Sequence, residues 1–198
     1  MELSKEIQAN RKTGHPIQPF LHNRWSPRAM TGEALSEEEL MSLFEAARWA
    51  PSSYNAQPWR ILYATKGSKE WPLFFNLMVE FNQSWTKNAA VLLVFISSKL
   101  FIHNQKPSKT HSYDTGAAWM SLALEASARG LVAHGMEGFD FEKAAKDLGV
   151  PDTFQVEAMA AIGKRAPKET LSQALQEKEV PSDRLPLEKI IMQGKFKP

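Results

Sequence analysis

The sequence predicts one α+β domain in which helices surround a central, mostly antiparallel β-sheet. The chain has 198 residues, of which 43% are hydrophobic, so it can fill one core but not two large ones. Candidate strands and helices are mixed, but they do not alternate regularly as in a doubly wound parallel sheet. The run Ala89–Ser97 is continuously apolar, which is typical of a strand buried on both faces.

The N-terminal half begins with a polar stretch, residues 1–20, which we expect to form a short helix or arm before a single domain at 21–198. A helix is predicted over Glu37–Ala50, because Ser36 and Glu39 have the spacing of a capping box. Proline at position 51 ends this helix, since it cannot donate the next backbone hydrogen bond. After it we expect a loop over 51–58, a strand over Trp59–Thr65 and a helix over Phe74–Phe81.

The C-terminal half is expected to hold the rest of the sheet. In chain order we predict a strand over Ala89–Ser97, an irregular basic segment over Leu100–Ser112, a helix over Asp114–Arg129 ended by Gly130, a strand over Leu131–Met136, a helix capped by Asp140 and closed at Gly149, a strand over Gln155–Ile162 and an extended tail from Leu185. The helix over Asp114–Arg129 is apolar on nearly every side. It is therefore either the core helix of a monomer or a helix that a second subunit covers.

Composition excludes several classes of protein. Lys plus Arg number 24 and Asp plus Glu 22, so the net charge of +2 argues against nucleic acid as a partner. Cysteine is absent, which excludes disulfide scaffolds, thiolate nucleophiles and cysteine-ligated metals. The N-terminus lacks the apolar core of a signal peptide, and the longest apolar run is too short to cross a bilayer. We therefore expect a cytoplasmic protein with no membrane partner.

Common catalytic motifs are missing as well. The sequence has no GxGxxG fingerprint, no phosphate-binding GxxxxGK[ST] loop and no GxSxG elbow. Its five histidines show no HExxH and no pairing at four-residue spacing, so we expect no metal site. Redox chemistry, if present, must come from a bound organic cofactor or from a metal with nitrogen and oxygen ligands.

Four short segments carry the polar groups that remain. The first places two guanidinium groups around a serine hydroxyl, which suits a phosphate or an enolate-like oxygen. The second packs two hydroxyls and two amides into six positions, and amides suit the edge of a heteroaromatic ring. The third has two glycines around a glutamate, so a flat ligand can approach its backbone, and the fourth offers two cations. They are Asn23–Arg28, Pro51–Trp59, Gly135–Asp140 and Gly163–Arg165.

Each segment also has a purely structural interpretation. The four alternatives are a solvated basic turn, a turn that ends a helix, a left-handed turn with a helix cap and an exposed strand end. The second segment is the hardest to explain in this way, because a turn needs one or two polar groups and this one has four.

In order and spacing, from about Asn23 to Phe196, the segments resemble the nitroreductase family of FMN-dependent oxidoreductases. The loop of the form PSSxNxQPW is intact at Pro51–Trp59, and the EGFD turn is present at Glu137–Asp140. The family's N-terminal motif of arginine, serine and a basic residue corresponds to Arg24, Ser26 and Arg28.

This resemblance implies an α+β homodimer with two FMN sites at the subunit interface and with NADH or NADPH as electron donor. It implies cofactor contacts in four groups: Arg24, Trp25, Ser26 and Arg28 at the phosphate and pyrimidine side; Pro51, Ser52, Ser53, Asn55 and Gln57 from the other subunit; Asn82 at the pyrimidine edge; and the backbone of Glu137 and Gly138 at flavin N5. No side chain is expected to act as a catalytic acid or base.

The last cation of the phosphate clamp is left open by the sequence. Lys164 and Arg165, which follow the predicted strand over Gln155–Ile162, are the first choice. Relatives place a Lys-x-Arg pair nearer the C-terminus, where this chain has Ser182-Asp183-Arg184 and so lacks the lysine. The assignment therefore stays between Arg165 and Arg184.

The activity that the resemblance implies is hydride transfer through FMN to a nitroaromatic, a quinone or a similar small acceptor, with ping-pong kinetics. The segment Leu100–Ser112 is the expected lid over the flavin. One alternative is a specialised enzyme on the same fold, such as a dehalogenase, a flavin-modifying or an azoline-oxidising enzyme. The others are a non-catalytic flavin-binding or storage protein and a small nucleic-acid-binding domain.

Overall fold

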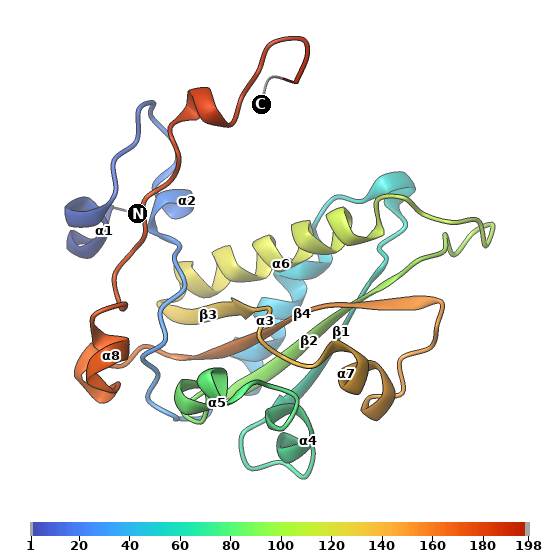
Figure 1. Ribbon diagram of the computed structural model, residues 1–198, viewed down its shortest axis with the longest axis horizontal. Helices are drawn as coiled ribbons and strands as arrows, with labels where there is room; N and C mark the ends of the chain where they lie inside the picture. The colour runs from blue at the N-terminus through green and yellow to red at the C-terminus, as the bar shows by residue number, and fades with distance from the viewer. Residues whose placement is uncertain (1, 197–198) are drawn as a thin grey trace.

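A four-stranded antiparallel sheet forms the centre of the computed structural model, which describes residues 2–196 (Figure 1). Its strands lie in the order β1-β2-β4-β3. They are β1 (Trp59–Thr65), β2 (Val91–Ser98), β3 (Leu131–Met136) and β4 (Phe154–Lys164). Met1 and residues 197–198, the outer ends of the expected arm and domain, lie outside the described residues. The predicted α+β class is confirmed, and every strand pair is antiparallel.

Helices cover both faces of this sheet (Figure 1). The helices are α1 (Lys5–Asn10), α2 (Pro19–Asn23), α3 (Glu37–Arg48), α4 (Trp71–Phe75), α5 (Glu80–Thr86), α6 (His111–Ala128), α7 (Phe141–Asp147) and α8 (Gln173–Gln176), with short 3₁₀ turns η1 (Ser53–Asn55), η2 (Lys168–Thr170) and η3 (Leu187–Lys189). One core lies between the sheet and α3 and α6. The other lies between the sheet and α4, α5 and α7.

Strand β2 is buried along its whole length, as its apolar run predicts. Successive side chains of a strand point to opposite faces, so Leu92 and Val94 join one core while Leu93 and Phe95 join the other. Strand β2 therefore contributes side chains to both cores.

The capping box of α3 is confirmed. The hydroxyl of Ser36 accepts from the backbone N–H of Glu39 at 3.1 Å, and the carboxylate of Glu39 accepts from the N–H of Ser36 at 2.7 Å. The helix ends at Arg48, two residues before the predicted end, and Trp49 caps it. Asp140 likewise caps α7, and Gly149 follows with the positive φ of 66° that a helix-ending glycine adopts.

The prediction of a helix over Phe74–Phe81 is wrong. The chain leaves α4 at Phe75 and enters α5 only at Glu80, because the residues between them pair with the turn before α7. Met78 and Phe139 form an isolated β-bridge, and the N–H of Val79 donates to the carbonyl of Gly138 at 3.1 Å. Local apolar periodicity cannot reveal such a long-range backbone partner.

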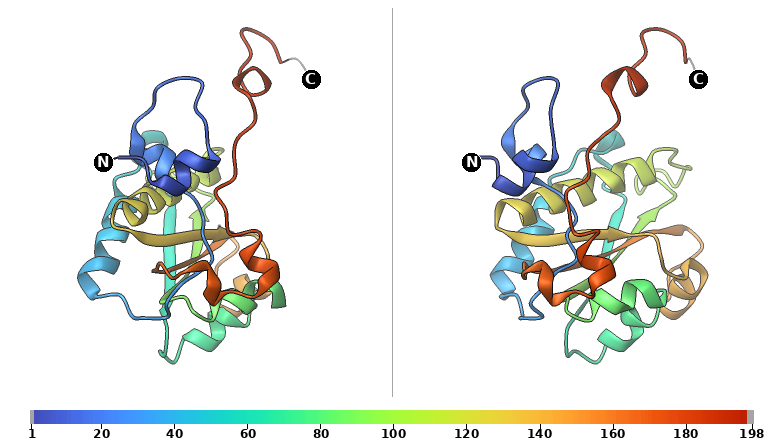
Figure 2. Two further views of the ribbon diagram at one scale, coloured as in Figure 1. Left: turned by 90° about the vertical axis from the view of Figure 1, so that its left-hand side faces the viewer. Right: turned by 60° about the vertical axis from the view of Figure 1, so that its left-hand side comes forward.

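The ends of the chain differ from simple expectation. The expected arm over residues 1–20 contains α1 and only the first two residues of α2, and both helices lie close to the C-terminal segment (Figure 1). From Leu185 the described part of the tail forms no strand and one 3₁₀ turn, and it extends away from the body (Figure 2). Within residues 2–196, no helix is both long and apolar enough to span a bilayer.

Candidate functional site

The N-terminal basic segment offers donors beside a pocket. The hydroxyl of Ser26 accepts from Nη1 of Arg24 at 3.1 Å, so these two side chains form one polar unit. The Nε atom of Arg28 is buried and has no hydrogen-bond partner among the described residues. A buried guanidinium N–H without an acceptor lowers the stability of the folded state, so this group is a candidate for binding an external oxygen or nitrogen.

A chain of contacts joins this segment to Asn82 and Gly138. The imidazole of His134 lies 2.9 Å from the carbonyl of Pro27 through Nδ1, and its ring centroid lies 4.6 Å from that of Trp85. The indole N–H of Trp85 donates to Oδ1 of Asn82 at 3.3 Å, and Nδ2 of Asn82 donates to the carbonyl of Gly138 at 3.0 Å. Two of the four predicted segments, together with Asn82, are thus connected within one subunit.

His134 is neutral at physiological pH. The pKa of His134 falls from 6.5 to about 4, chiefly because of burial and also because of the positive charges of Arg28 and Arg24, although the hydrogen bond to Pro27 opposes this. A carbonyl can only accept, so Nδ1 carries the proton of the neutral ring. His134 therefore holds the backbone of the basic segment without adding charge. This role could not be predicted from the sequence, since a lone histidine gives no signal.

The turn after β3 is built for close approach. A Cβ atom at Gly138 would lie 2.6 Å from Nδ2 of Asn82 and 3.2 Å from Cγ2 of Val79, so a side chain does not fit there. The carbonyl of Gly138 is occupied by Val79 and Asn82, whereas its N–H has no acceptor within residues 2–196. The side chain of Glu137 is exposed. This turn can donate one backbone hydrogen bond to a flat ligand.

Lys164 and Arg165 are both engaged with acids of the same chain. Nζ of Lys164 lies 3.3 Å from the carboxylate of Glu33 at the surface. The guanidinium of Arg165 lies 3.3 Å from Glu179 and 3.5 Å from Glu6, and it stacks over the ring of Trp25 at 4.6 Å. Much of the positive charge of Arg165 is therefore matched inside the protein.

Arg184 lies in a pocket with Arg24. The pocket has a volume of about 700 Å³ and is formed between the residues around α2 and the segment 183–188. Its charged lining includes the guanidinium groups of Arg11, Arg24 and Arg184 and the carboxylates of Asp183 and Glu188, so arginine outnumbers the acids. Burial and the neighbouring charge of Arg184 lower the pKa of Arg24, as expected for guanidinium groups that lie close together. Such a pocket suits an anion.

Arg11 and Glu179 were not identified from the sequence. Arg11 is 8% exposed and donates to the carbonyls of Ser182, His22 and Arg24 at 2.8 to 2.9 Å. Glu179 is 1% exposed and accepts from the backbone of Arg28. Both residues stand in polar surroundings in the sequence, so no local pattern marks them as buried.

The loop over 51–58 has an unusual backbone. Tyr54, Asn55 and Gln57 have φ values of 53°, 51° and 47°, a region that side chains other than glycine, asparagine and aspartate rarely adopt. The N–H of Gln57 donates to the hydroxyl of Ser52 at 3.0 Å, and the N–H of Ser53 donates to the buried carboxylate of Asp114 at 3.1 Å. Strain of this kind concentrates at binding sites.

This loop is far from the other segments within one subunit. Asp114 anchors it at the first turn of α6, whose 18 residues span about 27 Å. In Figure 1 the cyan segment around η1 lies beyond the right-hand end of α6, whereas α2, just before Arg24, lies toward the left-hand end. One subunit therefore brings together the segments at Arg24, Asn82, Gly138 and Arg165, but not the loop over 51–58.

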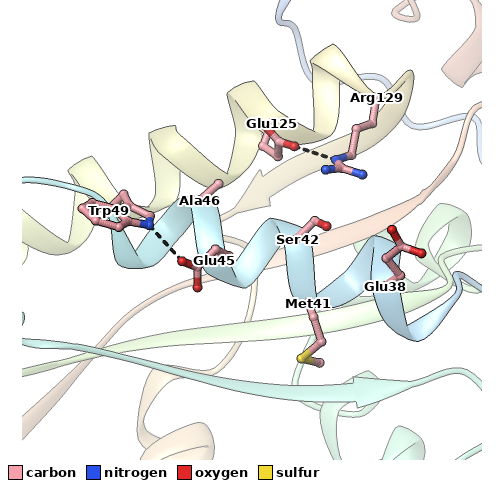
Figure 3. A pocket seen from close by; sticks show the side chains of 8 residues that line it. All are labelled: Glu38, Met41, Ser42, Glu45, Ala46, Trp49, Glu125 and Arg129. Carbon is pink, nitrogen blue, oxygen red and sulfur yellow. Dashed lines mark hydrogen bonds and ion pairs between the residues drawn. The ribbon is translucent and has the colours of Figure 1, made fainter.

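A second pocket of about 500 Å³ lies along α3 and the end of α6 (Figure 3). Its charged groups are mostly paired: the carboxylate of Glu45 accepts from the indole of Trp49 at 2.8 Å, and Arg129 donates to Glu125 at 2.6 Å. None of the predicted site residues lines it. Trp49 lines this pocket, and 75% of it is exposed to solvent.

Similar proteins include both sequences and solved structures. One crystal structure, described as that of the oxidoreductase containing FMN, is 46% identical to this chain and superposes with a TM-score of 0.90. The match covers 94% of this chain and 96% of the chain in that structure. An NADH dehydrogenase of Thermus thermophilus is 28% identical and covers 85% of this chain and 91% of its own. An uncharacterised 15.4 kDa protein of Mycolicibacterium smegmatis is 36% identical over 94 residues, and the match spans 47% of this chain and 63% of that protein.

The family profile described as the Nitroreductase family matches residues 21–73 and 63–164. These two matches include the basic segment, the loop over 51–58, Asn82 and the EGFD turn. The chain belongs to the nitroreductase family.

Proposed function

We propose that this protein is an FMN-dependent oxidoreductase that passes electrons from NADH or NADPH to a nitroaromatic, a quinone or a similar small acceptor. The observation that carries the proposal is the chain of contacts from the basic segment to Gly138, beside which the buried Nε of Arg28 has no hydrogen-bond partner within residues 2–196. A similar solved structure is described as containing FMN, which supports this choice of cofactor.

The residues present fit the phosphate end of FMN. Nη1 of Arg24 and the hydroxyl of Ser26 form one polar unit at the pocket that Arg184 also lines. Arginine groups bind phosphate oxygens through charge-assisted hydrogen bonds, and nearby guanidinium groups without a carboxylate partner gain from an anion between them. We assign the phosphate to Arg24, Ser26 and Arg184. Arg165, the other candidate, is held by Glu179 and Glu6.

The residues also fit the ring end. Asn82 and the N–H of Gly138 offer donors at the side of the sheet that Trp85 and His134 support. The free Nε of Arg28 would donate to the pyrimidine side, and its positive charge would favour negative charge on the ring. Trp25, Glu137 and Lys164 remain secondary contacts in this proposal.

We further propose that the site is completed by a second copy of the chain. The polar groups of Pro51, Ser52, Ser53, Asn55 and Gln57 would come from the partner, since their loop is remote from Arg24 in one subunit. Large apolar side chains are exposed in one subunit, including Trp49, Tyr113, Leu185 and Ile191. A homodimer would bury such side chains.

Bound FMN would supply hydride acceptance and donation, so the protein needs no catalytic acid or base for that step. The chain's own residues would bind the phosphate, orient the ring against β3 and present one face to both substrates. Two substrates that use the same face in turn give ping-pong kinetics.

The test is a titration of the purified protein with FMN, followed by anaerobic addition of NADH or NADPH. We expect flavin absorbance near about 450 nm that bleaches rapidly and returns when a quinone is added. A protein that binds no FMN would refute the proposal. Binding with slow or absent bleaching would favour a storage protein instead, and intersecting initial-rate plots would exclude the ping-pong scheme.

A further inference from the structure

Glu179 carries a carboxylate with no exposed side-chain surface, three residues after α8. Its Oε1 accepts from the backbone N–H of Arg28 at 2.8 Å and from that of Ala29 at 2.9 Å, and its Oε2 accepts from the N–H of Arg28 at 3.0 Å. Nη1 of Arg165 lies 3.3 Å from Oε1. A buried carboxylate requires such compensation, because it has lost its hydration.

The partners of Glu179 belong to two cofactor-binding candidates. One backbone donor is the N–H of Arg28, at the end of the basic segment, and the other is the N–H of Ala29, the next residue, so Glu179 fixes the path of the chain that carries Arg28. The third partner is Arg165, whose guanidinium is also held by Glu6 and by the face of Trp25. Glu179 therefore helps to fix the positions of Arg28 and Arg165.

The same C-terminal segment brings in Arg184. Ser182, between Glu179 and Arg184, accepts through its carbonyl from Nε of Arg11 at 2.8 Å, and Nη1 of Arg11 donates to the carbonyl of Arg24 at 2.8 Å. The segment 179–184 is thus tied to the basic segment at two points. Arg184 reaches the pocket of Arg24 as part of this arrangement.

We propose that Glu179 is a positioning residue for the phosphate end of the site. It fixes the backbone at Arg28 and retains Arg165, so that Arg24 and Arg184, rather than Arg165, face a bound phosphate. The identity of the phosphate rests on the proposed function, whereas the attachment of the segment 179–184 does not.

The test compares Glu179→Gln with the double variant Glu179→Gln/Arg165→Gln and with Glu177→Gln, a nearby exposed control. Glutamine keeps the size of the side chain but leaves the guanidinium of Arg165 without its buried counter-charge. Removing one partner of a buried ion pair is strongly destabilising, so we expect E179Q to weaken FMN binding at least about tenfold. The double variant should restore the Kd, which a loss of shape alone would not allow.

A second readout needs no cofactor. Trypsin cleavage after Arg184 in FMN-free protein reports whether the segment 179–184 is held, and we expect at least about tenfold faster cleavage in E179Q, with the wild-type rate in the double variant and in E177Q. If wild-type protein binds no FMN, the proposed function fails, while these cleavage rates still decide the role of Glu179.

Two single variants cover the case in which E179Q does not fold. Arg165→Gln should lower the stability, because the buried carboxylate loses its counter-charge. It leaves Glu179 its backbone donors at Arg28 and Ala29, so its FMN Kd should change by less than about threefold, whereas Arg184→Gln should raise the Kd at least about tenfold. The reverse ranking, wild-type behaviour of E179Q in both assays, or failure of the double variant to recover would overturn the proposal.

Discussion

The amide of Asn82 is locked to the carbonyl of Gly138, with Nδ2 donating at 3.0 Å, while its Oδ1 accepts from the indole of Trp85 at 3.3 Å. Asn82 is 8% exposed, so both ends of its amide are fixed by the protein. One donor hydrogen remains on Nδ2 after these bonds. The hydrogen bond between Asn82 and Gly138 joins α5 to the turn after β3, and it makes the position of Asn82 sensitive to any change at Gly138.

Gly138→Ala should therefore lower both stability and FMN affinity. The added Cβ would lie 2.6 Å from Nδ2 of Asn82, so the amide must move away from the carbonyl that it binds. Overpacking of this kind costs about 1–3 kcal/mol of unfolding free energy. Denaturant melts and FMN titrations of the same preparations measure both effects.

Gly116→Ala is the matched control for that substitution. Gly116 lies inside α6, and a Cβ atom there would meet nothing within 4 Å. Alanine is favoured over glycine inside a helix by about 1 kcal/mol, so this variant should be as stable as the wild type or more stable. A G138A protein that matched G116A in stability and FMN affinity would contradict the tight packing at the turn.

Arg24→Ala should weaken FMN binding by about 1.5–3 kcal/mol, the range for a charge-assisted hydrogen bond. Its guanidinium forms a unit with Ser26 and lines the pocket shared with Arg184. The control is Lys143→Ala, which removes a cation paired with Asp147 on α7. Equilibrium dialysis at two salt concentrations should show the larger salt dependence for the wild type, and an unchanged Kd in R24A would count against the phosphate assignment.

Mixing two inactive variants tests whether the site is shared between subunits. If Arg24 and Asn55 act from different chains, a mixed dimer of Arg24→Ala and Asn55→Ala contains one intact site and one doubly altered site. Random pairing then restores roughly a quarter of the wild-type sites. FMN bound per chain, measured before and after co-refolding, gives the answer: no recovery would place all the contacts in one subunit.

His134 should make the protein less stable in acid. Its pKa falls from 6.5 to about 4 on folding, so the folded state binds fewer protons than the unfolded state between these values. The stabilisation is complete above pH 6.5 and declines as pH falls toward about 4, by about 1.4 kcal/mol per pH unit and roughly 3 kcal/mol in total.

The measurement compares wild type with His134→Gln by denaturant unfolding at several pH values between these limits. Glutamine does not titrate, so the difference in unfolding free energy between the two proteins should shrink as the pH is lowered. Parallel pH profiles would show that His134 is not the group responsible.

Local signals in the sequence predicted the fold well. The capping box of α3, the continuous apolar run of β2 and the left-handed glycine after α7 each depend on only a few neighbouring residues. The interrupted region between α4 and α5 was predicted wrongly, because its backbone bonds to Gly138 and Asp140, far along the chain. Tertiary pairing there outweighs an apolar pattern that alone would favour a helix.

The candidate site, like the fold, could be predicted from the sequence only in part. The segments at Arg24 and Gly138 are marked by residue type and spacing, so the sequence was enough to select them. Arg11, His134 and Glu179 were missed, because their roles depend on burial and on carbonyl or amide partners supplied by other segments. Choosing between Arg165 and Arg184 likewise needs the position of Glu6 and Glu179 in space.

The bond between Glu179 and the backbone of Ala29 spans 150 residues of sequence. On the ribosome, the stretch around Ala29 emerges long before its carboxylate partner has been translated. The nascent polypeptide must therefore keep these amides solvated or loosely covered until the acid arrives. The bonds that hold the phosphate end of the site can therefore form only late in biosynthesis. A ribosome that stops before codon 179 releases a product that cannot form this part of the molecule.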